Sequence, residues 1–128
     1  MNLIFDSLEQ AIHSLKKALN QPKNEFVRDA VIQRFEYSFE LSWKCLKRVL
    51  KEDFGAQEMP LKDLFRLAAK YQLLDDPSQW FKYLEARNLT APTYNEAQAE
   101  SVYTIAKMAC QDFSILLKNL KNVSHKNI

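Results

Sequence analysis

The scarcity of glycine restricts the fold of this chain more than any other feature. Among 128 residues there is one glycine, Gly55, together with four prolines. A multi-stranded sheet needs many tight turns, and glycine is the usual residue where a turn requires a positive φ angle. The chain is therefore predicted to consist of a few long elements, which means helices.

Apolar residues recur at steps of three and four along five segments, and this spacing places them on one face of a helix. The predicted helices cover residues 2–20, 24–52, 60–71, 77–88 and 95–121. The sequence therefore predicts a single all-α domain over residues 1–128. We expect an up-and-down four-helix bundle with one short extra helix.

Several residues mark where these helices begin and end. Gly55 is expected to cap the end of the second helix. Asp76 suits the N-cap of the fourth helix, with Pro77 at its first position. Asn95 and the glutamine three residues later form a capping-box pattern at the start of the fifth helix. The last seven residues are predicted to be a frayed tail.

The second predicted helix carries an apolar surface that is wider than one face of a bundle requires. Phe35, Phe39 and Trp43 lie on this surface. A large apolar surface on a soluble chain usually marks an interface with another molecule. The pattern therefore predicts a homodimer, with these three residues at the interface.

Composition excludes some classes of protein. Eighteen basic and sixteen acidic residues give a net charge of +2, which by itself does not indicate a nucleic-acid coat. No apolar run approaches the roughly 20 residues that span a bilayer. The first residues lack a signal-peptide pattern, so a cytoplasmic protein without a membrane partner is expected. Cys45 and Cys110 are predicted to be buried free thiols.

Metal-binding and catalytic patterns are absent from the sequence. The only histidines are His13, expected on a helix surface, and His125, in the tail. There is no Glu-x-x-His pair of the kind used by di-iron bundles and no Cys-x-x-Cys. A glycine-rich phosphate loop and a Ser-His-Asp pattern are missing as well. The chain is predicted to hold no metal and no cofactor of its own.

The polar segment of residues 85–100 is the candidate binding site. Its polar side chains gather just before the fifth helix: Arg87, Asn88, Thr90, Thr93, Tyr94 and Asn95. Free N–H groups at a helix start favour an anion, and a guanidinium group can bind phosphate with two hydrogen bonds. The alternative is that Arg87 pairs with a nearby carboxylate, Glu85 or Glu96, and that the segment only turns the chain.

A second polar feature lies on the second predicted helix. Glu36, Glu40 and Lys44 follow one another at steps of four residues. Such a ladder ordinarily lies at a solvated helix edge, where each pair contributes a few tenths of a kcal/mol. The alternative is a polar seam that lines a groove.

Two stretches carry a resemblance to a known family. They are RDAVIQRFEYSFELSWKCLKRVL (residues 28–50) and WFKYLEARNLTAPTYNEAQAESVY (residues 80–103). In this order and at this separation they resemble the nucleotidyltransferase substrate-binding family of the HEPN superfamily, over nearly the whole chain. The resemblance implies a helical bundle that dimerises and a small nucleotidyltransferase partner encoded nearby. It places Mg and NTP in that partner.

Many HEPN proteins are metal-independent ribonuclease toxins with an Arg-x4–6-His motif, often followed two residues later by tyrosine. The resemblance places the arginine at Arg87, the tyrosine at Tyr94 and the histidine position at Pro92. Proline has no titratable group, so acid–base catalysis by this motif is not expected. The resemblance implies that Tyr94 is a target for AMP attachment by the partner.

The leading hypothesis is a non-catalytic partner subunit. It would bind nucleotide or phosphate, or an RNA end, near Arg87, Thr93, Tyr94 and Asn95. A HEPN-type ribonuclease toxin of a toxin–antitoxin pair is the alternative, and it is weakened by Pro92. A plain structural dimer is the remaining option.

Overall fold

The computed structural model describes residues 2–90 and 95–126, and these residues form five helices and no strand. The helices are α1 Asn2–Leu19, α2 Glu25–Phe54, α3 Leu61–Lys70, α4 Pro77–Leu89 and α5 Glu96–Lys126. The all-α fold class predicted from the sequence is confirmed.

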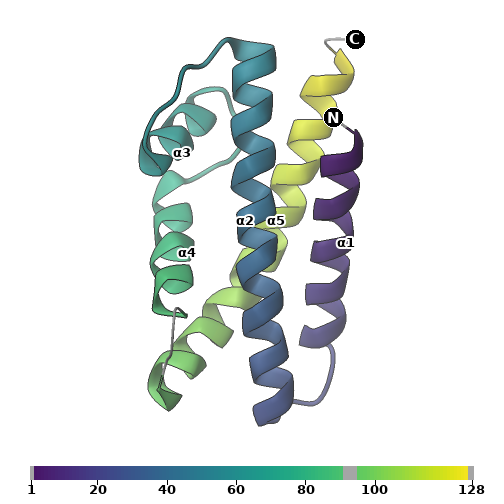
Figure 1. Ribbon diagram of the computed structural model, residues 1–128, viewed down its shortest axis with the longest axis vertical. Helices are drawn as coiled ribbons and strands as arrows, with labels where there is room; N and C mark the ends of the chain where they lie inside the picture. The colour runs from purple at the N-terminus through teal and green to yellow at the C-terminus, as the bar shows by residue number, and fades with distance from the viewer. Residues whose placement is uncertain (1, 91–94, 127–128) are drawn as a thin grey trace.

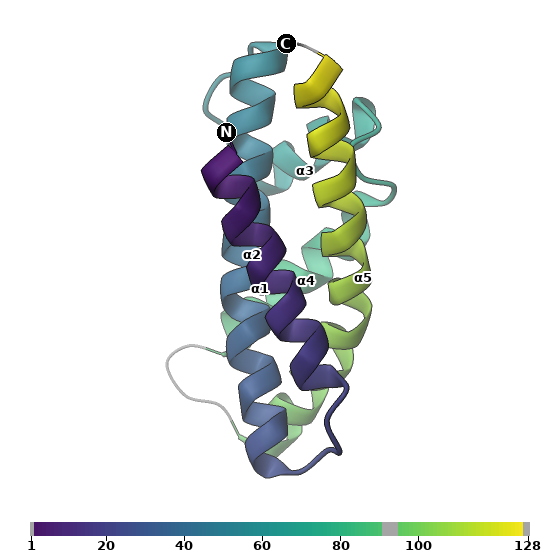
Figure 2. The same ribbon diagram turned by 90° about the vertical axis from the view of Figure 1, so that its right-hand side faces the viewer.

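Three long helices and two short ones make up the bundle. In Figure 1, α1 runs antiparallel to α2, and α5 runs beside both, so that the two ends of the chain lie at the same end of the bundle. The short helices α3 and α4 follow one another on the side of α2 away from α1, and together they fill the fourth position. Helices α2 and α5 each contact α1 and α4, whereas α1 contacts neither short helix. In Figure 2, which is turned by 90° from Figure 1, α1 lies in front of α2, with α5 at their side.

The predicted helix-end signals are confirmed. Gly55 has a φ angle of 70°, in the left-handed region, and its N–H donates to the Leu50 carbonyl at the end of α2. Asp76 accepts a hydrogen bond from the Ser78 N–H at 2.9 Å, which caps α4. At the start of α5, the side chain of Asn95 accepts from the Gln98 N–H at 2.8 Å. The Gln98 side chain accepts in return from the Asn95 N–H, at 3.1 Å.

One boundary prediction is wrong. Helix α5 continues to Lys126, whereas the sequence suggested a frayed tail from residue 122. The backbone ladder of a helix this long propagates at little cost per residue. The half-buried Val123 also packs against the core at this end, which favours continued helix.

A cluster of aromatic rings fills the centre of the bundle. The Phe39 ring lies within 6.5 Å, centroid to centroid, of the rings of Phe35, Phe65, Trp80 and Phe113. These residues come from α2, α3, α4 and α5, so the cluster joins the short helices to the long ones. Burying such rings stabilises the fold by about 1.5–3 kcal/mol each.

The aromatic cluster also explains the wide apolar surface of α2. Phe35 and Phe39 are completely buried inside the single chain, because α2 is covered by α1 on one side and by α3, α4 and α5 on the others. Only Trp43, of the three residues assigned to a dimer interface, keeps exposed area. A homodimer therefore remains a prediction, and Phe35 and Phe39 no longer motivate it.

Both cysteines are buried free thiols, as predicted. Burial raises the pKa of the Cys45 thiol to about 11, and it also raises the pKa of Cys110. Neither thiol is therefore an activated nucleophile. Within the described part of the chain, no helix is both long enough and apolar enough to cross a membrane.

Candidate functional site

Arg87 lies near the end of α4 and reaches across to α2. Its Nε donates a hydrogen bond to Glu40 Oε1 at 2.9 Å. The side chains of Arg87 and Glu40 are 32% and 31% exposed, so the pair lies at the rim of the bundle. Among the described residues, the guanidinium group of Arg87 has no hydrogen-bond partner other than Glu40. Glu40 contacts Nε and makes no hydrogen bond to the two terminal nitrogens of Arg87.

The packing of α4 fixes the position of Arg87. Trp80 and Tyr83, on the preceding turns, are almost completely buried. The Tyr83 hydroxyl donates a hydrogen bond to Asp112 of α5, and burial is the main reason that the pKa of Tyr83 is raised. Helix α4 is therefore held against α5 by a buried ring and a hydrogen bond. The direction in which Arg87 leaves the helix follows from these contacts.

The two polar features of the sequence meet in the structure. The predicted local partners of Arg87 were Glu85 and Glu96, but its partner is Glu40, which belongs to the ladder on α2. Glu40 thus lines the same site as Arg87 rather than a separate solvated edge. Sequence reasoning missed the pairing because 47 residues separate the two side chains.

The rest of the predicted site is described in part. The Thr90 hydroxyl is buried and donates to the Arg87 carbonyl at 2.6 Å, at the end of α4. Asn95 uses its side-chain oxygen to cap α5. Pro92, Thr93 and Tyr94 lie outside the described residues, so their place relative to Arg87 stays a prediction.

A second arginine makes a different kind of site. Arg28 of α2 is 6% exposed and pairs with Glu96 in the first turn of α5, with Nη1 2.6 Å from Oε2 and Nη2 3.3 Å from Oε1. Its Nη1 lies 3.5 Å from Glu100, and its Nε and Nη2 lie 3.3 Å from Asp29. The hydrogen bond to Glu96 is the main reason that the pKa of Arg28 is raised above its ordinary value.

Lys23 completes the Arg28 cluster. It pairs with Glu100, and this hydrogen bond is the main reason that the pKa of Glu100 is lowered; Arg28 acts in the same direction. Of this cluster only Glu96 was predicted from the sequence to pair with a cation, and its predicted partner was Arg87 rather than Arg28. The sequence does carry one signal of this cluster: Glu96 and Glu100 lie one helical turn apart beside the capping box. Two like charges at this spacing repel each other, so they are stabilised by a cation from elsewhere in the fold.

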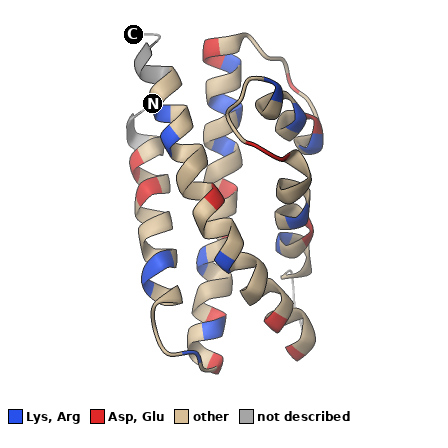
Figure 3. Cartoon of the chain, turned by 180° about the vertical axis from the view of Figure 1, so that it is seen from behind, with Lys and Arg blue, Asp and Glu red and all other residues tan. Residues whose placement is uncertain are grey.

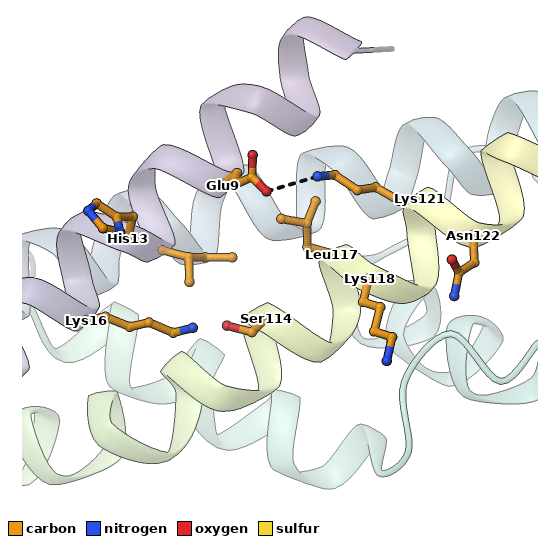
Figure 4. Close-up of a pocket in the computed structure, with 9 residues that line it drawn as sticks. Glu9, His13, Lys16, Ser114, Leu117, Lys118, Lys121 and Asn122 are labelled. Atoms are coloured by element: carbon orange, nitrogen blue, oxygen red, sulfur yellow. Dashed lines mark hydrogen bonds and ion pairs between the residues drawn. The ribbon is translucent and has the colours of Figure 1, made fainter.

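A groove between α1 and α5 encloses a cavity of about 430 Å³. Lysines line it from both helices: Lys16 from α1, and Lys118 and Lys121 from α5. Figure 4 shows Lys16 extending across the groove toward Ser114, and the ion pair between Glu9 and Lys121, which measures 3.1 Å. His13 is exposed on α1, as predicted, and lies at the edge of the groove. The sequence analysis did not identify this groove.

Metal ligands are not gathered in the described residues. No group of three or more His, Cys, Asp or Glu side chains there is placed to hold a metal ion.

Comparison with known proteins identifies the family. The model of the family described as nucleotidyltransferase substrate binding protein like matches residues 3–122. The chain belongs to this family. The resemblance read from residues 28–50 and 80–103 is thereby confirmed.

Relatives of known sequence or structure agree with this assignment. A Haemophilus influenzae protein named "Probable ribonuclease HepT" is 33% identical over 93% of this chain and 92% of its own length. A crystal structure from Thermus thermophilus has 34% identity and a TM-score of 0.81, covering 88% of this chain and 98% of that one.

Two further structures share the fold. A Haemophilus influenzae structure, described as the fold of a substrate-binding domain of a nucleotidyltransferase, has 29% identity and a TM-score of 0.82, covering 91% and 98% of the two chains. A Shewanella oneidensis HEPN toxin, tri-AMPylated and in complex with MNT antitoxin, has a TM-score of 0.75. It covers 93% and 94% of the two chains and, at 15% identity, shows the fold alone.

Proposed function

We propose that this chain is the non-catalytic, substrate-binding partner of a small nucleotidyltransferase. It acts as a homodimer and binds the phosphate of a nucleotide near Arg87 and Tyr94. The partner supplies the chemistry of nucleotidyl transfer, together with the Mg and NTP that this reaction uses. Membership of the family and a fold shared with a nucleotidyltransferase substrate-binding domain support this role.

The observation that carries the proposal is the geometry of Arg87. Glu40 holds Nε and thereby orients the guanidinium group, and a third of the side chain stays accessible to a ligand. A guanidinium group with its terminal nitrogens available can bind two phosphate oxygens at once. By the resemblance to the Arg-x4–6-His motif with tyrosine two residues later, Tyr94 would lie near the ligand as a target for AMP attachment.

The experiment combines the purified chain with the small nucleotidyltransferase encoded beside it, in the presence of ATP and Mg. We expect the two proteins to elute together and the chain to gain the mass of one or more AMP groups. A Tyr94→Phe variant should still co-elute but should not gain AMP. If the parent neither co-elutes nor gains AMP, the proposed function is wrong.

The homodimer is tested separately. Sedimentation at micromolar concentration should give twice the mass of the chain. Trp43 is half-buried on α2 and keeps exposed area, so Trp43→Ala should weaken the dimer if this face is used. A stable monomer would contradict the dimeric part of the proposal.

A ribonuclease is the second candidate function. It is supported by the relative named "Probable ribonuclease HepT" and by the fold shared with a HEPN toxin. Pro92 stands where the HEPN motif has its histidine, and proline can neither accept nor donate a proton. We therefore expect the parent to leave RNA intact.

The matching test is a gain of function. Purified parent, Pro92→His and the double variant Pro92→His/Arg87→Ala are incubated with total RNA. We expect no cleavage by the parent, and any cleavage by Pro92→His should vanish in the double variant. Robust cleavage by the parent that is lost on Arg87→Ala would favour the ribonuclease over the substrate-binding subunit.

A further inference from the structure

The groove between α1 and α5 is separate from the Arg87 site. It consists of the cavity described above and a second one of about 340 Å³, and the two share Lys16 and Ser114. Lys107 of α5 lines the second cavity. The lysine groove, as we call this pair of cavities, shares no lining residue with the Arg87–Glu40 pair.

The charge of the lysine groove is strongly one-sided. Four lysines line it, Lys16, Lys107, Lys118 and Lys121, against a single carboxylate, Glu9, which gives a net charge of +3 with His13 neutral. Glu9 is paired with Lys121. Within the described residues, Lys16 and Lys118 have no ion-pair partner. A concave surface of one charge sign concentrates ligands of the opposite sign.

The distribution of charge along the helices sharpens this asymmetry. Figure 3 shows acidic residues of α1 in its N-terminal half and basic residues in its C-terminal half, with further basic residues along α5. Asp112, the acidic residue in the middle of α5, hydrogen-bonds to Tyr83 of α4 and lines a cavity on that side. Asp112 therefore faces α4, whereas Lys121 of the same helix reaches Glu9 of α1.

The shape of the groove favours an extended ligand. From Lys107 to Lys121, helix α5 advances about 21 Å at the usual rise per residue. A mononucleotide would occupy one of the two cavities, whereas a strand of several nucleotides can follow both. Lysine binds phosphate oxygens as a point charge and imposes little geometry, which suits a flexible backbone.

A protein partner fits the groove less well. Lysine is depleted in the cores of protein–protein interfaces, and apolar and aromatic residues are enriched. Two of the apolar residues that line the groove, Ile12 and Leu117, are 4% and 6% exposed and a third, Leu19, is half-buried, so the apolar surface open to a partner is small. We propose that the lysine groove binds the phosphodiester backbone of single-stranded nucleic acid.

The same chemistry predicts that the groove does not distinguish one base from another. Tyr103, near the end of the groove, is 4% exposed and its ring is covered by Lys23 and Lys107 at 4.7 and 5.0 Å from the ring centroid. It therefore offers no face on which a base can stack. Binding should depend on salt, tolerate any base and differ little between RNA and DNA.

The test uses fluorescence anisotropy with labelled oligouridylate and oligothymidylate of about eight nucleotides, titrated with the full chain at about 50 to 200 mM salt. We expect both oligomers to bind the parent. The double variant Lys16→Gln/Lys118→Gln should bind roughly ten-fold more weakly at the lowest salt. Its salt slope should fall by about 1.4, the loss expected for two phosphate contacts to a single strand.

Two controls separate the groove from bulk charge and from misfolding. Lys51→Gln/Lys70→Gln removes two exposed lysines of α2 and α3 and should change the affinity less than about two-fold. Lys16→Arg/Lys118→Arg keeps the charge and should keep the affinity.

The proposal is overturned if the parent binds neither oligomer at low salt, or if Lys16→Gln/Lys118→Gln binds as tightly as the parent. It is also overturned if Lys51→Gln/Lys70→Gln loses as much affinity as Lys16→Gln/Lys118→Gln. If the parent binds neither oligomer while the groove variant loses the nucleotidyltransferase partner, the groove is a protein interface instead.

Discussion

Two arginines in this bundle pair with glutamates across helices, and their surroundings give them different roles. Arg28 is 6% exposed and contacts three carboxylates, those of Asp29, Glu96 and Glu100. The Arg87 side chain is 32% exposed and pairs with one carboxylate, that of Glu40. The charge of Arg28 is fully used inside the protein, whereas that of Arg87 is only partly used.

This difference separates an anchor from a binding group. Arg28 itself is buried, although its carboxylate partners are exposed, so truncating it removes a buried side chain together with its ion pairs and costs more than losing an exposed pair. Removing one partner of a rim pair costs about 0.2–1 kcal/mol. The contacts of the two arginines therefore show which one is free to bind a ligand.

The largest effect is expected for Arg28→Ala. The first turn of α5 would lose its link to α2, and three carboxylates would be left without their shared cation. We expect the melting temperature, followed by circular dichroism, to fall by roughly 5–10 °C. Arg28→Lys keeps the positive charge and should recover part of the lost melting temperature. The recovery should be incomplete, because an ammonium group cannot form the paired contact with Glu96. A melting temperature within about 2 °C of the parent would show that the cluster is not an anchor.

The contrast between the two arginines marks the limit of sequence reasoning. Local signals were sufficient where neighbours in the chain interact: Gly55, Asp76 and the Asn95 capping box all lie where predicted. The Arg28 and Arg87 pairings join residues 68 and 47 positions apart, and they depend on how the helices pack. A single sequence does not contain that geometry.

The second prediction concerns acid stability at the Arg28 cluster. The pKa of Glu100 is lowered in the folded chain, mainly by its hydrogen bond from Lys23. The stability from Glu100 is therefore fully present above its ordinary pKa of 4.5 and is lost as the pH falls through the lowered value. We expect Glu100→Gln to melt a few degrees below the parent at pH 7.

Melting curves at a series of pH values check this sign. The gap between Glu100→Gln and the parent should narrow as the pH falls below about 4.5, because the parent then loses the same charge. A gap that stays constant down to about pH 3 would mean that the charge of Glu100 does not stabilise the cluster.

The smallest effect on stability is expected for Glu40→Gln at the other site. The pair with Arg87 is partly exposed, so urea denaturation should show a loss of about 0.2–1 kcal/mol. Ligand binding should weaken a few-fold, because an amide holds the guanidinium group less firmly than a carboxylate. A loss of stability as large as that of Arg28→Ala would place Arg87 among the structural arginines.

The burial of aromatic residues shows a second limit of the sequence. The wide apolar surface of α2 was correctly recognised, but it was assigned to a second copy of the chain. The short helices α3 and α4 cover it within one chain, where Phe65 and Trp80 contact Phe39. An apolar pattern reports that a surface is covered and does not report by what.

The most direct test of the central claim, that Arg87 binds and Arg28 anchors, is a calorimetric titration of Arg87→Ala with ATP, paired with its melting curve. Loss of a charged hydrogen-bond partner should weaken ATP binding roughly ten- to a hundred-fold relative to the parent. The melting temperature should stay within about 3 °C of the parent. Unchanged affinity for ATP, or a fall in melting temperature as large as that of Arg28→Ala, would contradict the claim.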